Sequence, residues 1–150
     1  MKAVIQRVKY ASVKVDREII GAIDNGFLVL LGVSETDTKE DAEILARKTA
    51  SLRIFQDDEG KMNKSLLDLS YGALVISQFT LLADTKKGNR PSFIHAAKPE
   101  LAIPLYELFV DELKKNGVTE VAHGEFGADM KVELLNDGPV TIIYDTEQWK

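Results

Sequence analysis

The sequence contains no cysteine and only two histidines, His95 and His123. Without cysteine there is no disulfide, no thiolate nucleophile and no cysteine-ligated metal, and two histidines make a multi-histidine metal site a poor candidate. No apolar run reaches the roughly 18 residues that a membrane-spanning helix needs, and the N-terminus lacks the apolar stretch of a signal peptide. We therefore expect a cytoplasmic protein that uses neither a metal nor another cofactor.

Positive charge is also scarce. The chain has 19 lysines and arginines against 24 aspartates and glutamates, which gives a net charge of −5. This balance argues against a protein that coats DNA or RNA through a broad basic face, but it allows a local basic patch that grips a single RNA end. The rest of the composition is that of an ordinary globular protein, and 150 residues can bury a core without disulfides. We expect a single domain over residues 1–150.

The first third of the chain has the pattern of an antiparallel β-meander. Residues 2–15 alternate between apolar and polar side chains, which is the period of a half-buried strand. A short strand is expected at 19–23, and the apolar run 27–33 is typical of a central strand covered on both faces. Asn25-Gly26 is a strong turn signal between these two strands, because Asn-Gly tolerates positive φ.

Two longer segments have the spacing of amphipathic helices. Apolar residues recur at helical intervals over residues 38–52, directly after N-cap candidates. A second helix is expected from Pro99, which suits a first helical turn, to the stop signal Asn116-Gly117. Pro104 lies inside this helix and removes one backbone hydrogen bond, so we expect a bend near its start.

The remaining elements are mostly strands. A short strand is expected at 52–55 and a buried strand at Leu74–Leu82. Residues 130–135 and 140–144 alternate on either side of Asn136–Pro139, which predicts a C-terminal β-hairpin. The fold class is therefore α/β, with mixed, mostly antiparallel curved sheets and two main helices packed on one side.

The segment Leu74–Leu82 carries polar side chains where a buried strand should be apolar. The hydroxyls of Ser77 and Thr80 and the amide of Gln78 would each cost about 1–3 kcal/mol if they were buried without partners. They belong either to a strand end that caps a turn or to a strand end that opens into an active site.

A serine–histidine triad is one way to read these hydroxyls. It would need His95 as the base and Asp84 as the acid that orients it. Nothing like a nucleophile elbow surrounds Ser77, so a role for His95 near the start of the second helix fits the pattern better.

The loop over residues 83–95 holds the densest basic cluster of the chain, formed by Lys86, Lys87 and Arg90. These cations are candidates for phosphate contacts, although charged loops are more often simply solvated. In the segment Asn136–Pro139, a proline follows a glycine where the returning strand should begin, and proline lacks the backbone donor of a strand. The Gly138-Pro139 bond is either a cis bond with a purpose or part of a plain hairpin turn with a trans proline.

Ser77-Gln78-Phe79-Thr80-Leu81 and Asn136-Asp137-Gly138-Pro139-Val140-Thr141 occur together in a chain of this size. With them the chain resembles the D-aminoacyl-tRNA deacylases, the family first described as D-tyrosyl-tRNA deacylases. The resemblance covers essentially the whole chain and includes other segments, namely Ile5–Val8, Ala11–Val13, Gly60–Asn63, Asn89–Phe93 and Phe126–Met130.

The resemblance implies a three-layer β/β/α fold and a homodimeric enzyme. Such an enzyme hydrolyses the ester between a D-amino acid and the 3′ end of tRNA, and also removes mischarged glycine. Each active site lies at the subunit interface, where one subunit contributes the Ser77–Thr80 strand end and the other contributes a Gly138-Pro139 turn with a cis bond. No membrane or DNA partner is implied.

The resemblance also implies roles for individual residues. The backbone amides of Phe79 and Thr80 stabilise the oxyanion, and Gly138-Pro139 is the chirality filter. The substrate is bound by Ser77, Gln78 and Met130. Because no base is evident near Thr80 in the sequence, we expect its hydroxyl to position the substrate and not to attack it.

Two other functions remain open from the sequence. A non-catalytic homodimeric module could bind an RNA 3′ end or a small metabolite, and composition does not separate it from the enzyme. A conventional serine–histidine esterase is the third alternative.

Overall fold

The computed structural model describes residues 1–150, and its main sheet is organised around one long strand, β1. On one edge β1 pairs first with β3 and then, beyond Val8, with β2, while its other edge pairs with β8. All three pairings are antiparallel. The strands span Lys2–Val15 (β1), Glu18–Ile23 (β2), Gly26–Gly32 (β3) and Lys131–Asp145 (β8).

The sheet continues past β3 through two parallel strands. β6 (Gly72–Ser77) pairs with β3, and β7 (Val121–His123) pairs with β6. Parallel neighbours need a crossover connection, and these two contain the main helices α1 (Lys39–Ala50) and α3 (Pro99–Lys115). Since β7 also contacts β2, the curled sheet nearly closes on itself.

The remaining elements are short. They are β4 (Phe55–Gln56), β5 (Met62–Lys64), α2 (Leu66–Leu69) and the 3-10 helices η1 (Phe79–Leu82) and η2 (Thr146–Trp149). None of the helices has the length and apolar character that crossing a membrane requires.

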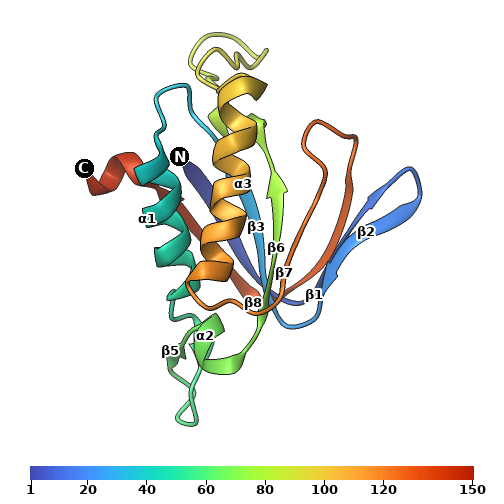
Figure 1. Ribbon diagram of the computed structural model, residues 1–150, viewed down its shortest axis with the longest axis vertical. Helices are drawn as coiled ribbons and strands as arrows, with labels where there is room; N and C mark the ends of the chain where they lie inside the picture. The colour runs from blue at the N-terminus through green and yellow to red at the C-terminus, as the bar shows by residue number, and fades with distance from the viewer.

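Two apolar clusters divide the molecule into three layers. The larger one lies between the helices and the sheet and includes Leu45 of α1, Val75 of β6 and Phe109 of α3. The smaller one lies between the other face of β6 and the curled parts of β1, β2 and β8, and includes Val13 and Leu74. Figure 1 shows both helices on one side of the sheet, with the β1–β2 arm projecting away from them. The expected mixed α/β class, with helices on one side of curved sheets, is confirmed.

Several expectations about single strands are wrong. The strand expected over Leu74–Leu82 ends at Ser77 and continues as η1. The strand expected at 52–55 is reduced to Phe55–Gln56, and the C-terminal hairpin does not form. The two main helices agree with expectation, and α3 runs through Pro104 without interruption.

β8 replaces the hairpin because both of its halves find partners on β1. Asn136 lies opposite Val8 and Thr141 lies opposite Gln6, so five residue steps on β8 match two on β1. The three surplus residues bulge out of the sheet and do not reverse the chain. A bulge and a hairpin turn both favour a glycine with positive φ, here +138° at Gly138, so local sequence does not distinguish them.

Candidate active site

The chain leaves the sheet where β6 ends at Ser77. The Gln78 N–H still donates to a β3 carbonyl at 2.8 Å, and Phe79 then begins η1. η1 packs over Gly32, the last residue of β3, where a Cβ would lie 2.7 Å from the Leu82 side chain. The absence of a side chain at Gly32 therefore lets the strand end bend into η1 and bury Leu82.

The first backbone amides of η1 are free of helical partners. The Leu81 N–H is the first that donates back, to the Gln78 carbonyl at 3.2 Å. The N–H groups of Phe79 and Thr80 precede it, and N–H groups at the start of a helix have no acceptor within that helix. Both residues are exposed, so these donors can meet negative charge that develops on a bound ligand.

The Thr80 hydroxyl accepts a hydrogen bond from the side-chain amide of Gln78. An amide nitrogen only donates, so it orients the hydroxyl oxygen but cannot remove its proton. No histidine or carboxylate forms a hydrogen bond with this hydroxyl. The arrangement therefore suits a group that positions a ligand better than one that attacks it.

An apolar cavity opens beside Ser77 and Gln78. Its other lining residues come from β3 and the residue after it, from η1, from α3 and the residues before it, and from the loop after β7: Leu31, Val33, Phe79, Ala97, Ala102, Tyr106, Phe126 and Gly127. The Tyr106 hydroxyl donates to the Val75 carbonyl at 2.8 Å, and burial raises the pKa of Tyr106, so this wall is fixed and uncharged. The polar end of β6 thus meets a rigid apolar surface.

The Gly138-Pro139 bulge is held from two sides, and its peptide bond is cis. The Arg7 Nε donates to the Asp137 carbonyl at 3.0 Å, and the Asn136 side-chain oxygen accepts the Val140 N–H at 2.9 Å. Gly138 is packed closely, because a Cβ there would lie 2.7 Å from Val140 Cγ2. The backbone at this point is therefore well fixed although both Gly138 and Pro139 are exposed.

Within one chain the bulge and the end of β6 lie far apart. The bulge faces Arg7 of β1, which pairs with Phe27 of β3, which pairs in turn with Ala73 of β6. Ser77 lies four residues further along β6 and three strands across from β8. Strand spacing and rise then give a separation of roughly 20 Å.

Comparison with known proteins identifies the family. The family model described as D-Tyr-tRNA(Tyr) deacylase matches residues 4–145. The chain belongs to this family. It is 58% identical to the D-aminoacyl-tRNA deacylase of Bacteroides fragilis (strain YCH46) over 98% of each chain. It is 60% identical to that of Fusobacterium nucleatum subsp. nucleatum, over 98% of this chain and 97% of the relative.

Solved structures share the fold of this deacylase family member. The "c-Myc DNA Unwinding Element Binding Protein" is 46% identical, with a TM-score of 0.91 over 97% of this chain and 98% of the other. A probable eukaryotic D-amino acid tRNA deacylase is 17% identical, with a TM-score of 0.81 over 95% and 97% of the two chains. At that low identity the likeness concerns the fold alone.

Met130, predicted to bind the substrate, lies on the opposite face of β6 from Ser77. Met130 is half-buried in the smaller apolar cluster, and both Met130 and Ile76 contact the position of Gly124. Successive side chains of a strand point to opposite faces, so Met130 lies on the other face of β6 from Ser77. Met130 therefore does not line the cavity beside Ser77.

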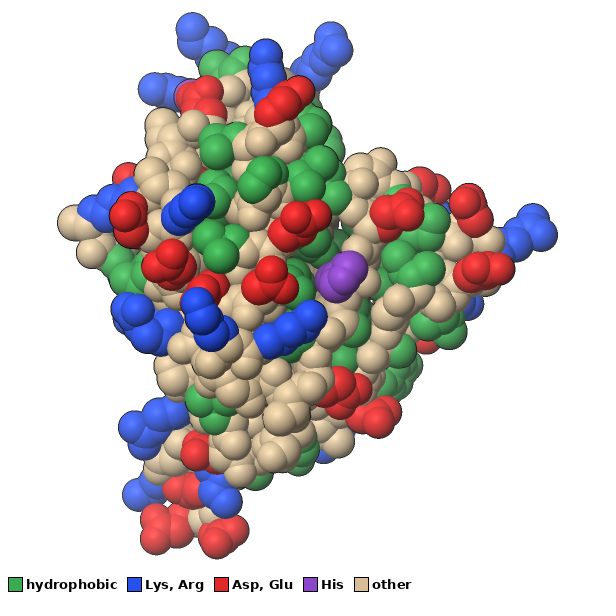
Figure 2. All heavy atoms as spheres, viewed as in Figure 1, with side chains coloured by type: hydrophobic (Ala, Val, Ile, Leu, Met, Phe, Trp, Pro, Cys, Tyr) green, Lys and Arg blue, Asp and Glu red, His purple; other side chains and the backbone are tan.

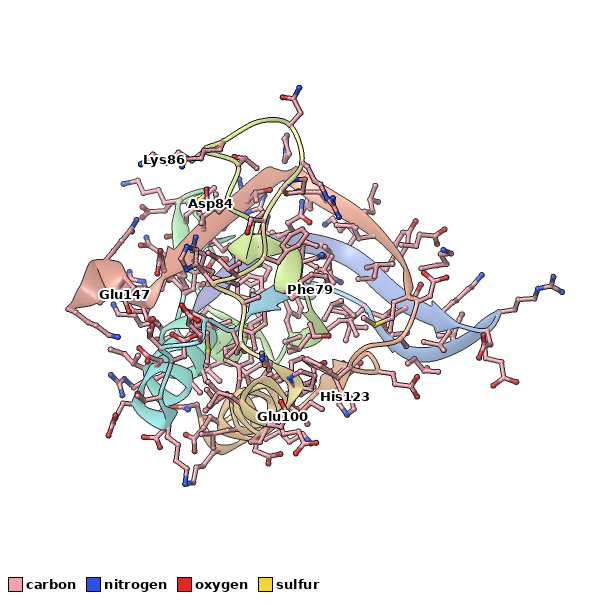
Figure 3. The ribbon with its side chains drawn as sticks, turned by 90° about the horizontal axis from the view of Figure 1, so that it is seen from above. Phe79, Asp84, Lys86, Glu100, His123 and Glu147 are labelled. Atoms are coloured by element: carbon pink, nitrogen blue, oxygen red, sulfur yellow. The ribbon has the colours of Figure 1, made fainter.

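The basic cluster lies on an exposed loop next to η1. The backbones of Asp84 and Ser92 pair at 2.7 and 2.9 Å, and this pair closes the loop that carries Lys86, Lys87 and Arg90. Figure 3, which looks down on this end, shows Asp84 and Lys86 on the loop that extends from the segment bearing Phe79.

His95 does not complete a triad with Ser77 or Thr80. Its Nδ1 lies 3.5 Å from Glu35 and its Nε2 lies 3.8 Å from Asp84. Asp84 is thus close to His95 as the triad required, but both ring nitrogens face carboxylates and none faces a hydroxyl. No group of three or more histidines and carboxylates is arranged to hold a metal ion.

Sequence reasoning missed Arg7 and the apolar wall of the cavity. The sequence did contain a sign of Arg7, because a cation next to Val8 interrupts the apolar and polar alternation of β1. Tyr106 and Ala102 left none, because a helix that lines a cavity and a helix that fills a core have the same apolar stripe.

Proposed function

We propose that this protein hydrolyses the ester bond of D-aminoacyl-tRNA and releases the free D-amino acid and tRNA. Membership of the D-Tyr-tRNA(Tyr) deacylase family supports the activity. The observation that carries it is the end of β6, where free amides, a neutral Gln78–Thr80 pair and an apolar cavity meet. The enzyme acts in proofreading during translation, in the cytoplasm.

The protein needs to contribute little to the reaction, because the neighbouring ribose hydroxyl already activates the ester for hydrolysis. The tRNA 2′-OH assists water in attacking the ester carbonyl, and the amides of Phe79 and Thr80 bind the oxyanion, a role worth about 2.7–4 kcal/mol. Ser77 and Gln78 bind the terminal adenosine beside the apolar cavity, and Met130 borders the substrate. The Thr80 hydroxyl positions the substrate, since a neutral amide is its hydrogen-bond partner.

Gly138-Pro139 acts as the chirality filter. Its backbone carbonyls lie close to the substrate Cα, where an L side chain collides with them and a D side chain does not. Backbone atoms cannot rotate away, and the hydrogen bonds from Arg7 and to Asn136 keep them in place. Glycine has no side chain to exclude, so mischarged glycyl-tRNA is hydrolysed as well.

The filter and the end of β6 come from different copies in a homodimer. The separation of roughly 20 Å within one chain supports this, because one substrate ester cannot meet both. An apolar row on the sheet face away from the helices supports it too: Ile143, Val4 and Leu30 lie side by side across three strands, and Ile143 is 71% exposed. We place the two-fold interface on this row, so that each bulge meets the end of β6 in the other copy.

The loop cations bind the acceptor end of the tRNA. Lys86, Lys87 and Arg90 are exposed beside η1 and are the tentative phosphate contacts. A small basic patch on an acidic protein limits its affinity for correctly charged tRNA, which the enzyme must release.

The test incubates D-tyrosyl-tRNA and L-tyrosyl-tRNA with the wild type and with Thr80→Val. We expect release of the D-amino acid alone, and a Thr80→Val turnover within a few-fold of the wild type. A loss of about 10⁴ in turnover with tRNA binding intact would make Thr80 the nucleophile. Release of neither amino acid would favour the non-catalytic binding module, and inactivation by a serine-directed inhibitor would favour the esterase.

A further inference from the structure

Phe79 presents an aromatic ring at the mouth of the cavity beside Ser77. The residue is 56% exposed, although large apolar side chains are usually buried. The proposed oxyanion role belongs to its backbone N–H and places no demand on the side chain. The exposed ring therefore needs an explanation of its own.

Phe93 lies against Phe79 from the far arm of the basic loop. The two ring centroids are 5.1 Å apart and the ring planes meet at 73°. The Asp84–Ser92 backbone pair closes the loop and keeps the adjacent Phe93 beside η1. This edge-to-face contact restrains the Phe79 ring but leaves more than half of the residue open to solvent.

Three cations accompany this aromatic pair. Lys86, Lys87 and Arg90 are exposed on the intervening loop, and none of the salt bridges of the protein involves them. Figure 2 shows basic side chains projecting at the end of the molecule where this loop lies. In a protein of net charge −5, this segment is a local concentration of positive charge.

We infer that Phe79 and Phe93 form a stacking platform for the bases of the unpaired nucleotides that precede the terminal adenosine of the tRNA. The inference rests on the proposed function. Single-stranded nucleic acids are bound by aromatic rings that stack on bases and by cations that follow the backbone. Residues 79–93 supply both parts within one segment.

The position of the rings favours a nucleic acid over a second copy of the chain. Phe79 shares the cavity with Ala102 and Tyr106 of α3, on the helix side of the sheet. The apolar row assigned to the second copy, which includes Ile143, lies on the opposite face. The terminal adenosine lies beside the cavity at Ser77 and Gln78, and the platform takes the nucleotides that precede it.

The test measures KM and kcat for two substrates that differ only in the preceding nucleotides, D-tyrosyl-tRNA and the D-tyrosyl ester of adenosine. Phe93→Leu removes a ring of the platform at a residue that does not line the cavity. We expect its KM for the tRNA to rise about tenfold, the typical loss for one stacked base, with a far smaller change for the adenosine ester. Phe93→Tyr restores the ring and should recover the wild-type KM.

The control is Ile19→Ser. Ile19 lies on β2 and is 60% exposed, similar to Phe79, and its replacement should leave both KM values unchanged. A Phe93→Leu variant that raises both KM values equally would overturn the platform, since the ring would then act at the ester itself. No change in either value would also overturn it and would leave a protein partner as the ligand of the exposed rings.

A binding measurement separates the platform from the catalytic proposal. The probe is a single-stranded RNA that ends in CCA and carries no amino acid, and its binding is measured by fluorescence anisotropy. Binding by the wild type that both Phe79→Leu and Phe93→Leu weaken would support the platform even if no ester were hydrolysed. Ester hydrolysis without such an effect on binding would overturn the platform and leave the deacylase proposal intact.

Discussion

Arg7 is a cation that the protein encloses almost completely, with 7% of the residue exposed. Taking a guanidinium out of water is costly unless its donors are satisfied. The carbonyls of Asp137 and Ile54 accept from Nε at 3.0 Å and from Nη1 at 2.7 Å. The planar guanidinium reaches both carbonyls at once, and one lysine ammonium cannot replace that geometry. Arg7 therefore ties the Gly138-Pro139 bulge to the chain before β4.

We predict that Arg7→Lys reduces the discrimination between D- and L-tyrosyl-tRNA. The charge is kept, but the link that Arg7 makes between the Asp137 and Ile54 carbonyls is broken, and a lost buried hydrogen bond costs about 1–3 kcal/mol of unfolding free energy. The measurement is the ratio of the D to L hydrolysis rates, with urea unfolding of the same variant.

Lys9→Ala is the matched control. Lys9 also lies near the Asp137 carboxylate, at 3.6 Å, but its side chain is 57% exposed. We expect both the rate ratio and the stability to remain those of the wild type, because exposed ion pairs contribute little. An Arg7→Lys variant with full discrimination would contradict the anchoring role.

Two elements end for reasons that involve their neighbours. β6 stops at Ser77 because its partner β3 ends at Gly32, where η1 packs into the space a side chain would fill. The β4–β5 hairpin is held by Asp57, whose carboxylate accepts from the N–H groups of Glu59 and Lys61 and from the Asn63 side chain. These polar contacts hold the β4–β5 hairpin, which directly follows Ile54, the residue whose carbonyl accepts a hydrogen bond from Arg7.

The acid response of this hairpin follows from Asp57. Hydrogen bonds from the Asn63 side chain and the Lys61 backbone hold the pKa of Asp57 below its usual 3.8. A lowered pKa means that the ionised group stabilises the fold above pH 3.8, and that this contribution is lost as the pH falls through the lowered value. We expect an NMR titration midpoint for Asp57 below 3.8 and a loss of amide protection in β4 and β5 over the same pH range.

Asp57→Ala should weaken that amide protection already at neutral pH. Asp58→Asn changes the neighbouring exposed carboxylate, which makes no hydrogen bond, and should have no effect. A titration midpoint of Asp57 at or above 3.8 would show that these hydrogen bonds do not hold the hairpin.

At the scale of the molecule, the proposed site is divided between two distant places on one curled sheet. The proposed substrate-binding part lies at the end of β6, and the proposed filter bulges from β8 beside Arg7. The larger core fills the helix side of the sheet, and Val4, Leu30 and Ile143 are left partly or largely uncovered on the other side. A second copy would cover this row and complete the site.

Because the chain has no cysteine, introduced cysteines test this arrangement cleanly. We predict that chains with Thr80→Cys and chains with Pro139→Cys form a disulfide-linked pair when mixed and oxidised, detected on a non-reducing gel. Adding Ile143→Glu to both should abolish the link, because a buried unpaired carboxylate opposes association. Adding Ile19→Glu, on the exposed part of β2, should not. A linked pair that survives Ile143→Glu would place the interface elsewhere.

The sequence by itself determined the class of the fold and the places where chemistry could occur. Apolar periodicity located β1, β3, α1 and α3, because side-chain spacing follows directly from backbone geometry. The hydroxyls and amide after Ile76 and the Asn-Asp-Gly-Pro segment stood out because such residues are unusual inside strands, although the sequence predicted a strand to Leu82 and a hairpin turn at these places.

Only the tertiary structure decided how these pieces are used. Whether Asn136–Pro139 reverses the chain or bulges depends on whether β1 offers partners to both halves of β8, which is a pairing between distant segments. Whether the strand continues past Ser77 depends on the space above Gly32. The roles of Arg7 and Tyr106 likewise arise from contacts with residues far away in the sequence, and local pattern carries no information about such contacts.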